Sequence, residues 1–429
     1  MLRNPLYRLL AAFAVPLPAF VLRLAHIELP PVYSMCLYGA AVVGAAVLLT
    51  WAAETAELDI SGSLSVALLA LIAILPEYAV DLYFAYAAGS KPEYAHYAAA
   101  NMTGSNRLLL GIGWPLVAFV AGLALRKAKR RLRKKGLETS RAVENSPAGP
   151  GGLTLQPKRR IELLFLGLAA LYSFTIPVTG TIALYDSAVL LAIYAVYVWR
   201  ISKEKVGEPE LEGVCAYVGC FPRWTRRGVV TGMFLAAATF ILASAQPFAE
   251  SLVATGRVLG IDEFMLVQWL APLVSESPEL IVACLLAYRL KGDSGLGTLL
   301  SSKVNQWTLL VASIPLAFLA GGGDGSLVLD ARQTEEFILT AAQTLLGFAV
   351  LFNLSFSWWE AGGLGALFLL QFPFPETSVR LGFSAVYVVL ALFLLVRHRR
   401  SLPAIWAQTF SKKLRTAEQV DPRQSNQRL

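Results

Sequence analysis

The sequence has few charged residues, few cysteines and few histidines for its length. Only 15% of its 429 residues are Asp, Glu, Lys or Arg, whereas soluble domains carry about 25%. The four cysteines and three histidines show neither a disulfide framework nor the spacing of a zinc site. No nucleotide-binding loop is present, so no ATP-driven step is implied.

Hydrophobic residues are abundant instead. They make up 56% of the chain, and the mean hydropathy is +0.57. They form continuous runs of roughly 18 to 30 residues, each long enough to cross a hydrocarbon core of about 30 Å as a helix. A β-barrel would need short alternating segments instead. We therefore predict an all-α, polytopic membrane protein.

The apolar runs predict twelve transmembrane helices. Their expected bounds are 6–26, 33–54, 62–88, 94–125, 160–178, 181–200, 228–252, 264–290, 296–320, 335–354, 357–373 and 379–397.

The distribution of basic residues supports this number of helices. Lysine and arginine accumulate on the cytoplasmic side of membrane proteins. With the N-terminus inside, the inner segments hold 30 of the 37 lysines and arginines, and the outer loops hold three. The largest cluster, 126–135, continues a helix out of the membrane and is expected to lie against anionic headgroups. Both termini are therefore predicted to be cytoplasmic.

Two parts of the chain resemble each other. A Pro-Glu pair occurs inside an apolar helix at Pro76-Glu77 and again at Pro278-Glu279, and a helix with small and polar residues follows each. The two Pro-Glu helices are the third and the eighth, so they cross the membrane in opposite directions. Inverted repeats of this kind indicate a transporter whose site lies at the bilayer midplane.

These residues resemble the cation/calcium exchanger superfamily, which includes the sodium/calcium exchangers. Its members carry a Pro-Glu in one helix of each repeat and a Gly-Ser-Asn in the next, which is intact here at Gly104-Ser105-Asn106. The resemblance implies two inverted five-helix repeats with one extra helix at each end. The expected segments are the extra helix 1–32, the first half 33–200 with its basic cytoplasmic loop 126–160, the connecting loop 201–227, the second half 228–373, the extra helix 374–400 and the cytoplasmic tail 401–429.

The site is expected around Glu77 and Glu279. A charged carboxylate inside a membrane helix costs about 2.5 to 3.5 kcal/mol. Two carboxylates about 6 Å apart would repel by about 3 kcal/mol at an effective dielectric near 20, so the pair should hold a cation or a proton. The candidate ion-binding residues are Glu77, Glu279, Asp81, Glu276, Ser105, Asn106, Ser275, Ser302, Asn305 and Gln306, with Glu77 and Glu279 as metal ligands.

The prolines of the motif suggest further oxygen ligands. Pro76 and Pro278 lack a backbone donor, which frees the carbonyls of Ile72 and Val274. Free carbonyls are ligands for hard cations, although a proline in a helix can also produce a kink and nothing more.

The motif also departs from the family pattern. Alignment of Pro115 with Pro315 pairs Gly104-Ser105-Asn106 with Val304-Asn305-Gln306, and leucines stand where the family has amides or carboxylates, at Leu109 and Leu309.

Two basic residues, Arg107 and Lys303, enter the motif helices and are expected to compensate charge. A cation beside the site lowers its affinity for a divalent ion. Both residues can form fixed salt bridges, or Lys303 can act as a tethered cation that exchanges a proton.

The function predicted from these features is secondary active antiport of Ca²⁺, Na⁺ or K⁺, with protons as the expected counter-ion. The partners are inorganic cations, protons and the lipid bilayer. No cofactor and no nucleic acid are expected, and the oligomeric state is left open. Short loops and the lack of a targeting signal favour a prokaryotic plasma membrane.

Two alternatives stay open. The chain could be a non-transporting scaffold or sensor whose site is closed by salt bridges from Arg107 and Lys303 to the acids. It could also be an intramembrane enzyme that uses the acids for proton transfer, although it lacks a paired nucleophile or a histidine cluster.

Overall fold

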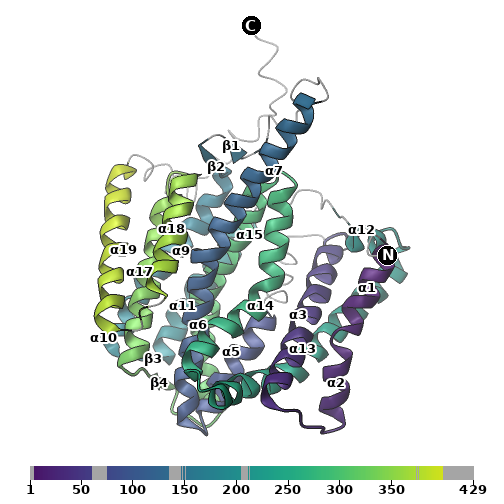
Figure 1. Cartoon of the computed structure of the whole chain (residues 1–429). Helices are drawn as coiled ribbons and strands as arrows, with labels where there is room; N and C mark the ends of the chain where they lie inside the picture. Colours follow the sequence, from purple (N-terminus) through teal and green to yellow (C-terminus); the bar gives the residue numbers. More distant parts are fainter. Residues whose placement is uncertain are drawn as a thin grey trace.

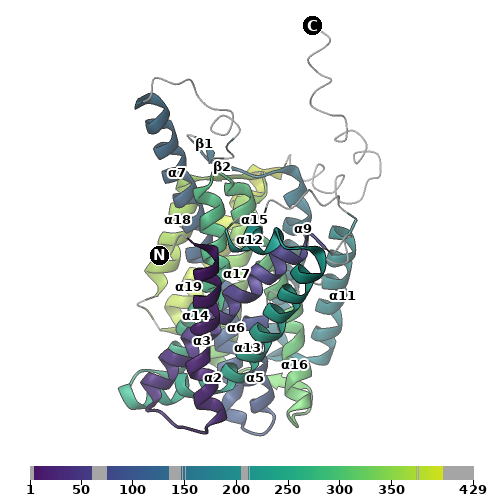
Figure 2. The same cartoon turned by 90° about the vertical axis from the view of Figure 1, so that its right-hand side faces the viewer.

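The computed structural model describes residues 4–59, 75–134, 146, 148–149, 151–203, 211, 213–372, 374 and 376–399. Its regular structure is almost entirely helical, and its described strands are two or three residues long. The helices stand side by side as a bundle, with α1 and α2 at one side and α19 at the other (Figures 1 and 2). The predicted all-α class is confirmed.

The helices match the predicted order. Before the first half come α1 (Pro5–Ala14) and α2 (Leu17–Leu24). The first half contains α3 (Pro31–Ala56), α5 (Leu75–Ala88), η1 (Pro92–Tyr94), α6 (Ala95–Leu108), η2 (Leu109–Gly113), α7 (Trp114–Lys134), η3 (Pro157–Arg159), α9 (Arg160–Ser173), α10 (Thr175–Thr179) and α11 (Leu184–Ile201). After α12 (Val214–Gly219), the second half contains α13 (Arg223–Leu259), α14 (Glu263–Tyr288), α15 (Gly292–Asn305), η4 (Gln306–Leu310), α16 (Val311–Ala320), α17 (Ala331–Leu351) and α18 (Trp358–Gln371), and α19 (Thr377–Arg397) follows.

Nine helical segments of the described chain are long and apolar enough to cross a membrane. The other three predicted spans coincide with helices that are short or carry polar residues. The first is α5, of which 14 residues are described, and the second is the continuous helical segment formed by α15, η4 and α16. The third is α18, which has 14 residues. A helix therefore stands at each of the twelve predicted positions, and for the helix predicted at 62–88 only the part from Leu75 is described.

Prolines divide two of the predicted spans. The span expected at 6–26 consists of α1 and α2, because Pro16 and Pro18 cannot donate helical hydrogen bonds. The span expected at 160–178 consists of α9 and α10, because Pro177 cannot donate to the carbonyl of Ser173.

Two small antiparallel sheets, which the periodicity of the sequence did not predict, tie loops together at opposite ends of the bundle. At one end, β2 (Gly152–Thr154) pairs with β1 (Ala148–Gly149) and with β5 (Ser355–Ser357). At the other end, β3 (Thr181–Ala183) pairs with β4 (Ser326–Val328). Each sheet therefore joins a segment of the first half to one of the second.

The segments predicted to be cytoplasmic lie at one end of the molecule. The strands β1 and β2 and the C-terminal end of α7 are at the top of Figure 1, and the beginning of α1 and α12 lie lower, at the upper end of the α1–α2–α3 group. The basic stretch 126–134 extends α7 beyond the bundle as a helix. This arrangement agrees with the predicted sidedness of the basic residues.

An ion pair joins α3 to α13 at this end. Asp59, which follows α3, accepts hydrogen bonds from Arg226 at 2.7 and 2.9 Å and from Arg227 at 3.2 Å. The hydrogen bonds from Arg226 hold the pKa of Asp59 below its usual value. The contact fixes the end of α3 against the beginning of α13, and the two helices pack together below it.

The second helix of each repeat has the same irregularity. A five-residue π-helical turn interrupts it, at η2 in the first half and at η4 in the second. Superposing the two turns places Ser105 opposite Ser302 and Asn106 opposite Lys303. The alignment based on Pro115 and Pro315 is therefore three residues out of register, because the π-helical turns do not lie at the same distance from the prolines.

The motif helices touch through their backbones at Gly104. A Cβ atom at this position would collide with the backbone carbonyl of Gln268 on α14. Because no side chain larger than hydrogen fits there, the glycine of the Gly-Ser-Asn motif lets α6 approach the Pro-Glu helix of the other half.

We predict that Gly104→Ala lowers the stability of the protein by about 1 to 3 kcal/mol, the usual cost of overpacking a core. Thermal unfolding of purified protein in detergent measures this difference. Gly232→Ala on α13 is the matched control, since a Cβ there meets nothing within 4 Å. Equal melting temperatures for the Gly104 variant and the wild type would show that α6 and α14 do not touch at this point.

Candidate ion-binding site

Four carboxyl groups come together from the two Pro-Glu helices, α5 and α14. Glu77, Asp81 and Glu276 are buried, with 4%, 0% and 1% of their surface exposed, and Glu279 is partly exposed. The carboxyl groups of Glu77 and Glu276 lie within hydrogen-bonding reach of each other. Asp81 and Glu279 are close enough to interact electrostatically with Glu77. The inverted repeat thus brings the predicted acids of both halves together.

Amide and hydroxyl groups of the adjacent helices bind three of these acids. The Nδ2 of Asn101 donates to Asp81 at 2.7 Å, and the Nε2 of Gln306 donates to Glu276 at 2.6 Å. The hydroxyl of Ser302 donates to Glu279. Each acid of this group is therefore oriented by a residue of α6, α15 or η4, the second helices of the two repeats.

Several buried oxygens at the site have no hydrogen-bond partner in the described structure. They are Glu77 Oε1, Asp81 Oδ2, Glu276 Oε2 and the hydroxyl of Ser105. Buried polar atoms almost always have a partner. The unpartnered oxygens are therefore suited to receive a proton or a cation. In the described part of the chain, no group of three His, Cys, Asp or Glu side chains is arranged to enclose a metal ion.

Lys303 is a buried cation within electrostatic range of the acids. Its side chain is 1% exposed, and its Nζ donates to the backbone carbonyl of Asn106 and, at 3.0 Å, to the side-chain oxygen of the same residue. Lys303 is within electrostatic range of Glu276 and Glu77, but no salt bridge joins it to them in the described structure. Its charge therefore acts on the site from a short distance.

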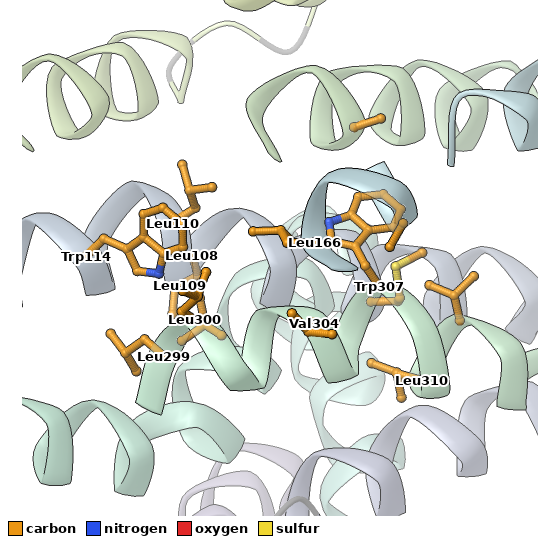
Figure 3. Packing of buried hydrophobic residues seen from close by; sticks show 14 of the residues in the cluster. Leu108, Leu109, Leu110, Trp114, Leu166, Leu299, Leu300, Val304, Trp307 and Leu310 are labelled. Atoms are coloured by element: carbon orange, nitrogen blue, oxygen red, sulfur yellow. The ribbon is translucent and has the colours of Figure 1, made fainter. Parts of the chain in front are cut away.

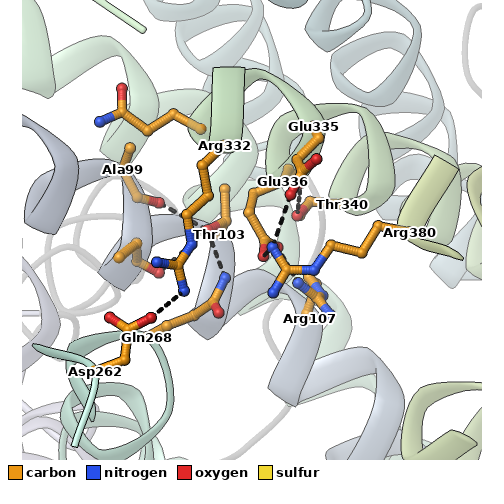
Figure 4. Close-up of polar contacts among 12 residues, drawn as sticks. Ala99, Thr103, Arg107, Asp262, Gln268, Arg332, Glu335, Glu336, Thr340 and Arg380 are labelled. Carbon is orange, nitrogen blue, oxygen red and sulfur yellow. Dashed lines mark hydrogen bonds and ion pairs between the residues drawn. The ribbon is translucent and has the colours of Figure 1, made fainter. Parts of the chain in front are cut away.

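Arg107 has an acidic partner outside the four acids. It forms a buried ion pair with Glu336 of α17, and its guanidinium lies 4.9 Å from the centre of the Trp269 ring. Arg380 of α19 binds Glu335 at 3.0 Å and Glu336 at 2.5 Å. Figure 4 shows this charge cluster of two arginines and two glutamates. Of the roles expected for Arg107, the structure shows a fixed salt bridge, and its partner is Glu336 instead of an acid of the Pro-Glu helices.

The other candidates are distributed around the acids. The hydroxyl of Ser275 donates to carbonyls within its own helix, and Asn305 is buried. The carbonyl of Val274, which Pro278 leaves without a helical donor, accepts from the hydroxyl of Ser277 at 2.9 Å. A cation bound to this carbonyl would share it with the Ser277 hydroxyl. The matching carbonyl of Ile72 lies outside the described residues.

Apolar packing surrounds the polar cluster. Leu109 and Trp114 are fully buried, and so are Leu299, Val304 and Trp307 of the second half. Figure 3 shows these side chains on the second helices of the two repeats, α6–η2–α7 and α15–η4. Leu109 stands where the family presents a polar side chain, and here it fills the core instead. This apolar packing belongs to the same second helices that carry Asn101, Ser302 and Gln306.

The comparisons with known proteins agree with the fold. Residues 30–203 and 229–374 match the family model described as sodium/calcium exchanger protein. This chain belongs to that family. It is therefore an integral membrane protein and a cation antiporter, as the sequence analysis expected.

Two solved structures illustrate the similarity. The chain is 42% identical to the protein of the "Crystal Structure of H+/Ca2+ Exchanger CAX", with a TM-score of 0.84, over 94% of this chain and 97% of that one. It shares the fold of native YfkE at 15% identity and a TM-score of 0.60, over 87% of this chain and 99% of that one. The comparison with curated proteins finds no match.

Sequence reasoning missed the charge cluster on α17 and α19. Glu335 and Glu336 lie in the first turns of α17, and Arg380 lies near the beginning of α19. Charged residues within predicted spans were the available signal, since Arg107 and Arg380 both fall inside such spans. Because an unpaired charge is costly inside a membrane protein, the buried arginines Arg107 and Arg380 indicate buried acidic partners.

We predict that Glu336→Gln destabilises the protein by about 3 to 5 kcal/mol, the cost of leaving a buried charge without its partner. The measurement is the midpoint of thermal unfolding in detergent. Glu93→Gln, the same substitution at an exposed position of η1, is the control and should leave the midpoint unchanged. An unchanged midpoint for Glu336→Gln would mean that the ion pair between Arg107 and Glu336 does not contribute to the stability of the protein.

Proposed function

We propose that the protein exchanges Ca²⁺ for protons at the site formed by Glu77, Asp81, Glu276 and Glu279. The observation that carries the proposal is the burial of acids from opposite halves of the inverted repeat, Glu77 and Glu276, on two helices that pack together, with oxygens that have no hydrogen-bond partner in the described structure. The similarity to an H⁺/Ca²⁺ exchanger over nearly the whole chain supports the choice of ions.

Charge makes protons and cations compete for this site. Two ionised carboxylates about 4 Å apart repel by about 4 kcal/mol at an effective dielectric of 20. A proton shared by Glu77 and Glu276 turns this repulsion into a hydrogen bond. A divalent cation removes the same repulsion by binding both groups. Since one Ca²⁺ carries the charge of two protons, the site can bind either one Ca²⁺ or two protons with the same net charge.

The polar residues around the acids have separate roles in this proposal. Ser302 and Gln306 orient Glu279 and Glu276, Ser105 presents an unpartnered hydroxyl from the first half, and Asn106 holds Lys303. Ser275 and Asn305 stand in the next layer. Arg107 stays with Glu336 and does not take part in loading.

The closed-site alternative is less well supported. It requires Arg107 and Lys303 to form salt bridges with the acids, but Arg107 pairs with Glu336 and Lys303 donates to Asn106. The unpartnered oxygens of Glu77 and Glu276 also favour a site that accepts an ion. No observation on the described residues favours an enzymatic role.

We place the basic end of the bundle, with α7 and the beginning of α1, on the cytoplasmic side. The excess of lysine and arginine at this end supports that orientation. A prokaryotic plasma membrane is the proposed location.

We predict that Ca²⁺ added outside proteoliposomes with an acidic lumen raises the lumenal pH, because Ca²⁺ entry drives protons out. A lumenal pH dye records the change. Glu77→Gln and Glu279→Gln should each abolish it, and Glu93→Gln should leave it intact. No Ca²⁺ response from folded, reconstituted wild-type protein would reject Ca²⁺/H⁺ exchange, and a response to Na⁺ or K⁺ alone would assign another ion.

We also predict that Lys303→Gln lowers the Ca²⁺ concentration for half-maximal exchange about tenfold or more. Removing a positive charge within electrostatic range of Glu276 and Glu77 makes the site more attractive to a divalent ion. The same liposome assay, run over a range of Ca²⁺ concentrations, measures this. A raised half-maximal concentration would show that Lys303 helps to build the site and does not oppose Ca²⁺.

A further inference from the structure

A groove of about 520 Å³ lies between α7 and α18, away from the ion site. Residues between Pro115 and Arg126 line it on α7, and residues between Trp358 and Leu369 line it on α18. Except for Arg126, which stands at one end, the lining is apolar. The two helices run antiparallel here, since Gly122 faces Trp358 and Gly365 faces Pro115.

Glycine on α18 keeps the groove open. A Cβ on Gly362, which lines the groove, would meet nothing within 4 Å. The step from Pro115 to Arg126 covers eleven residues, which is about 16 Å along a helix. One leaflet of a bilayer has a hydrocarbon thickness of about 15 Å. The groove therefore has the length of the acyl region of one leaflet.

A second groove of about 570 Å³ begins where the first one ends. The two share Leu123 and Arg126 in their linings. The second is strongly basic, and its charged lining consists of Arg126, Lys127, Arg130, Arg131 and Lys134. No salt bridge to an acid occupies these five side chains within the described part of the chain. Lys127 donates to the hydroxyl of Tyr288 at 2.7 Å, which links α7 to α14.

We propose that the two grooves form one binding site for an anionic phospholipid of the leaflet at the basic end. An acyl chain lies between α7 and α18, and the lipid phosphate is bound by Arg126 and Arg130. The argument is charge complementarity: an apolar groove of one-leaflet length opens into a cluster of unpaired cations. A zwitterionic lipid offers the same chains, but its own ammonium group competes with these cations for the phosphate. The site is separate from the exchange site and does not depend on its ion.

Native mass spectrometry of the full-length protein in detergent tests this site. The probes are a phosphatidylglycerol and a phosphatidylcholine with identical acyl chains, and glycerol phosphate as the headgroup without chains. We expect one phosphatidylglycerol to bind at least tenfold more tightly than phosphatidylcholine, and glycerol phosphate to bind too weakly to detect. Arg126→Gln should weaken the binding of phosphatidylglycerol about fivefold, since each basic residue near an anionic lipid contributes a factor of that order to the affinity.

Matched variants separate the site from general effects of charge and packing. Arg133→Gln removes a charge from the same helix outside the grooves, and should not alter binding. Gly362→Leu fills the apolar groove without a clash, and should remove the tightly bound lipid. Gly363→Leu, the same change at a neighbouring glycine that is also open but outside the lining, should not. All four variants are compared at equal melting temperature or at a temperature where each is folded.

Other results would overturn the proposal. Equal binding of the two lipids would remove the anionic specificity, and equal effects of Arg126→Gln and Arg133→Gln would mean that the charge acts nonspecifically. Equal loss in Gly362→Leu and Gly363→Leu would remove the groove from the explanation. A dimer mass that dissociates when lipid is added, or when Gly362→Leu is introduced, would show that a second copy of the chain covers the groove instead.

Discussion

The fold depends on the cost of carboxylates in an apolar core. Two helices each carry a Pro-Glu inside a membrane span, and the structure brings acids of both helices together, three of them buried and Glu279 partly exposed. Isolated, each charge would destabilise its span. Together they form a site that is stable only when a proton, an amide or a cation neutralises the repulsion. The amide and hydroxyl residues of the second helices, such as Gln306 and Ser302, supply part of this compensation permanently. The remaining part is left for the transported ions.

The second charge cluster solves the same problem in the opposite way. Arg107, Glu336, Arg380 and Glu335 are buried, and their formal charges cancel. Such a cluster needs no ion from outside. It joins the motif helix α6 to α17 of the other half and to α19, the helix added beyond the two repeats. Since Arg107 directly follows Asn106, the cluster also fixes the position at which Asn106 meets Lys303. The acids of the Pro-Glu helices are thus available to ions, whereas the arginine–glutamate cluster holds the surrounding helices together.

The features that could be predicted from the sequence are those encoded locally. The Pro-Glu pairs, the Gly-Ser-Asn motif and the distribution of basic residues give the helix order, the inverted repeat and the acids of the site. What could not be predicted depends on contacts between distant residues. Arg107 lies next to the motif, yet its partner Glu336 is 229 positions away. Pro278 leaves the carbonyl of Val274 without a helical donor, as expected, but the hydroxyl of the nearby Ser277 donates a hydrogen bond to it. The π-helical turns lie at different distances from Pro115 and Pro315, and this three-residue difference in register is not visible in the apolar pattern.

The corrected register shows why two similar halves give a site with unequal sides. The positions of Asn106 and Lys303 are equivalent in the two repeats, and these two side chains bind each other. Symmetry would place either two amides or two cations there. Two ammonium groups in contact would repel and would also cancel the negative charge that attracts a cation. Two amides would leave the acids with no fixed cation nearby. One lysine and one asparagine give a satisfied contact and a single positive charge, so that the site remains negative enough to bind a cation and yet can release it when protons arrive.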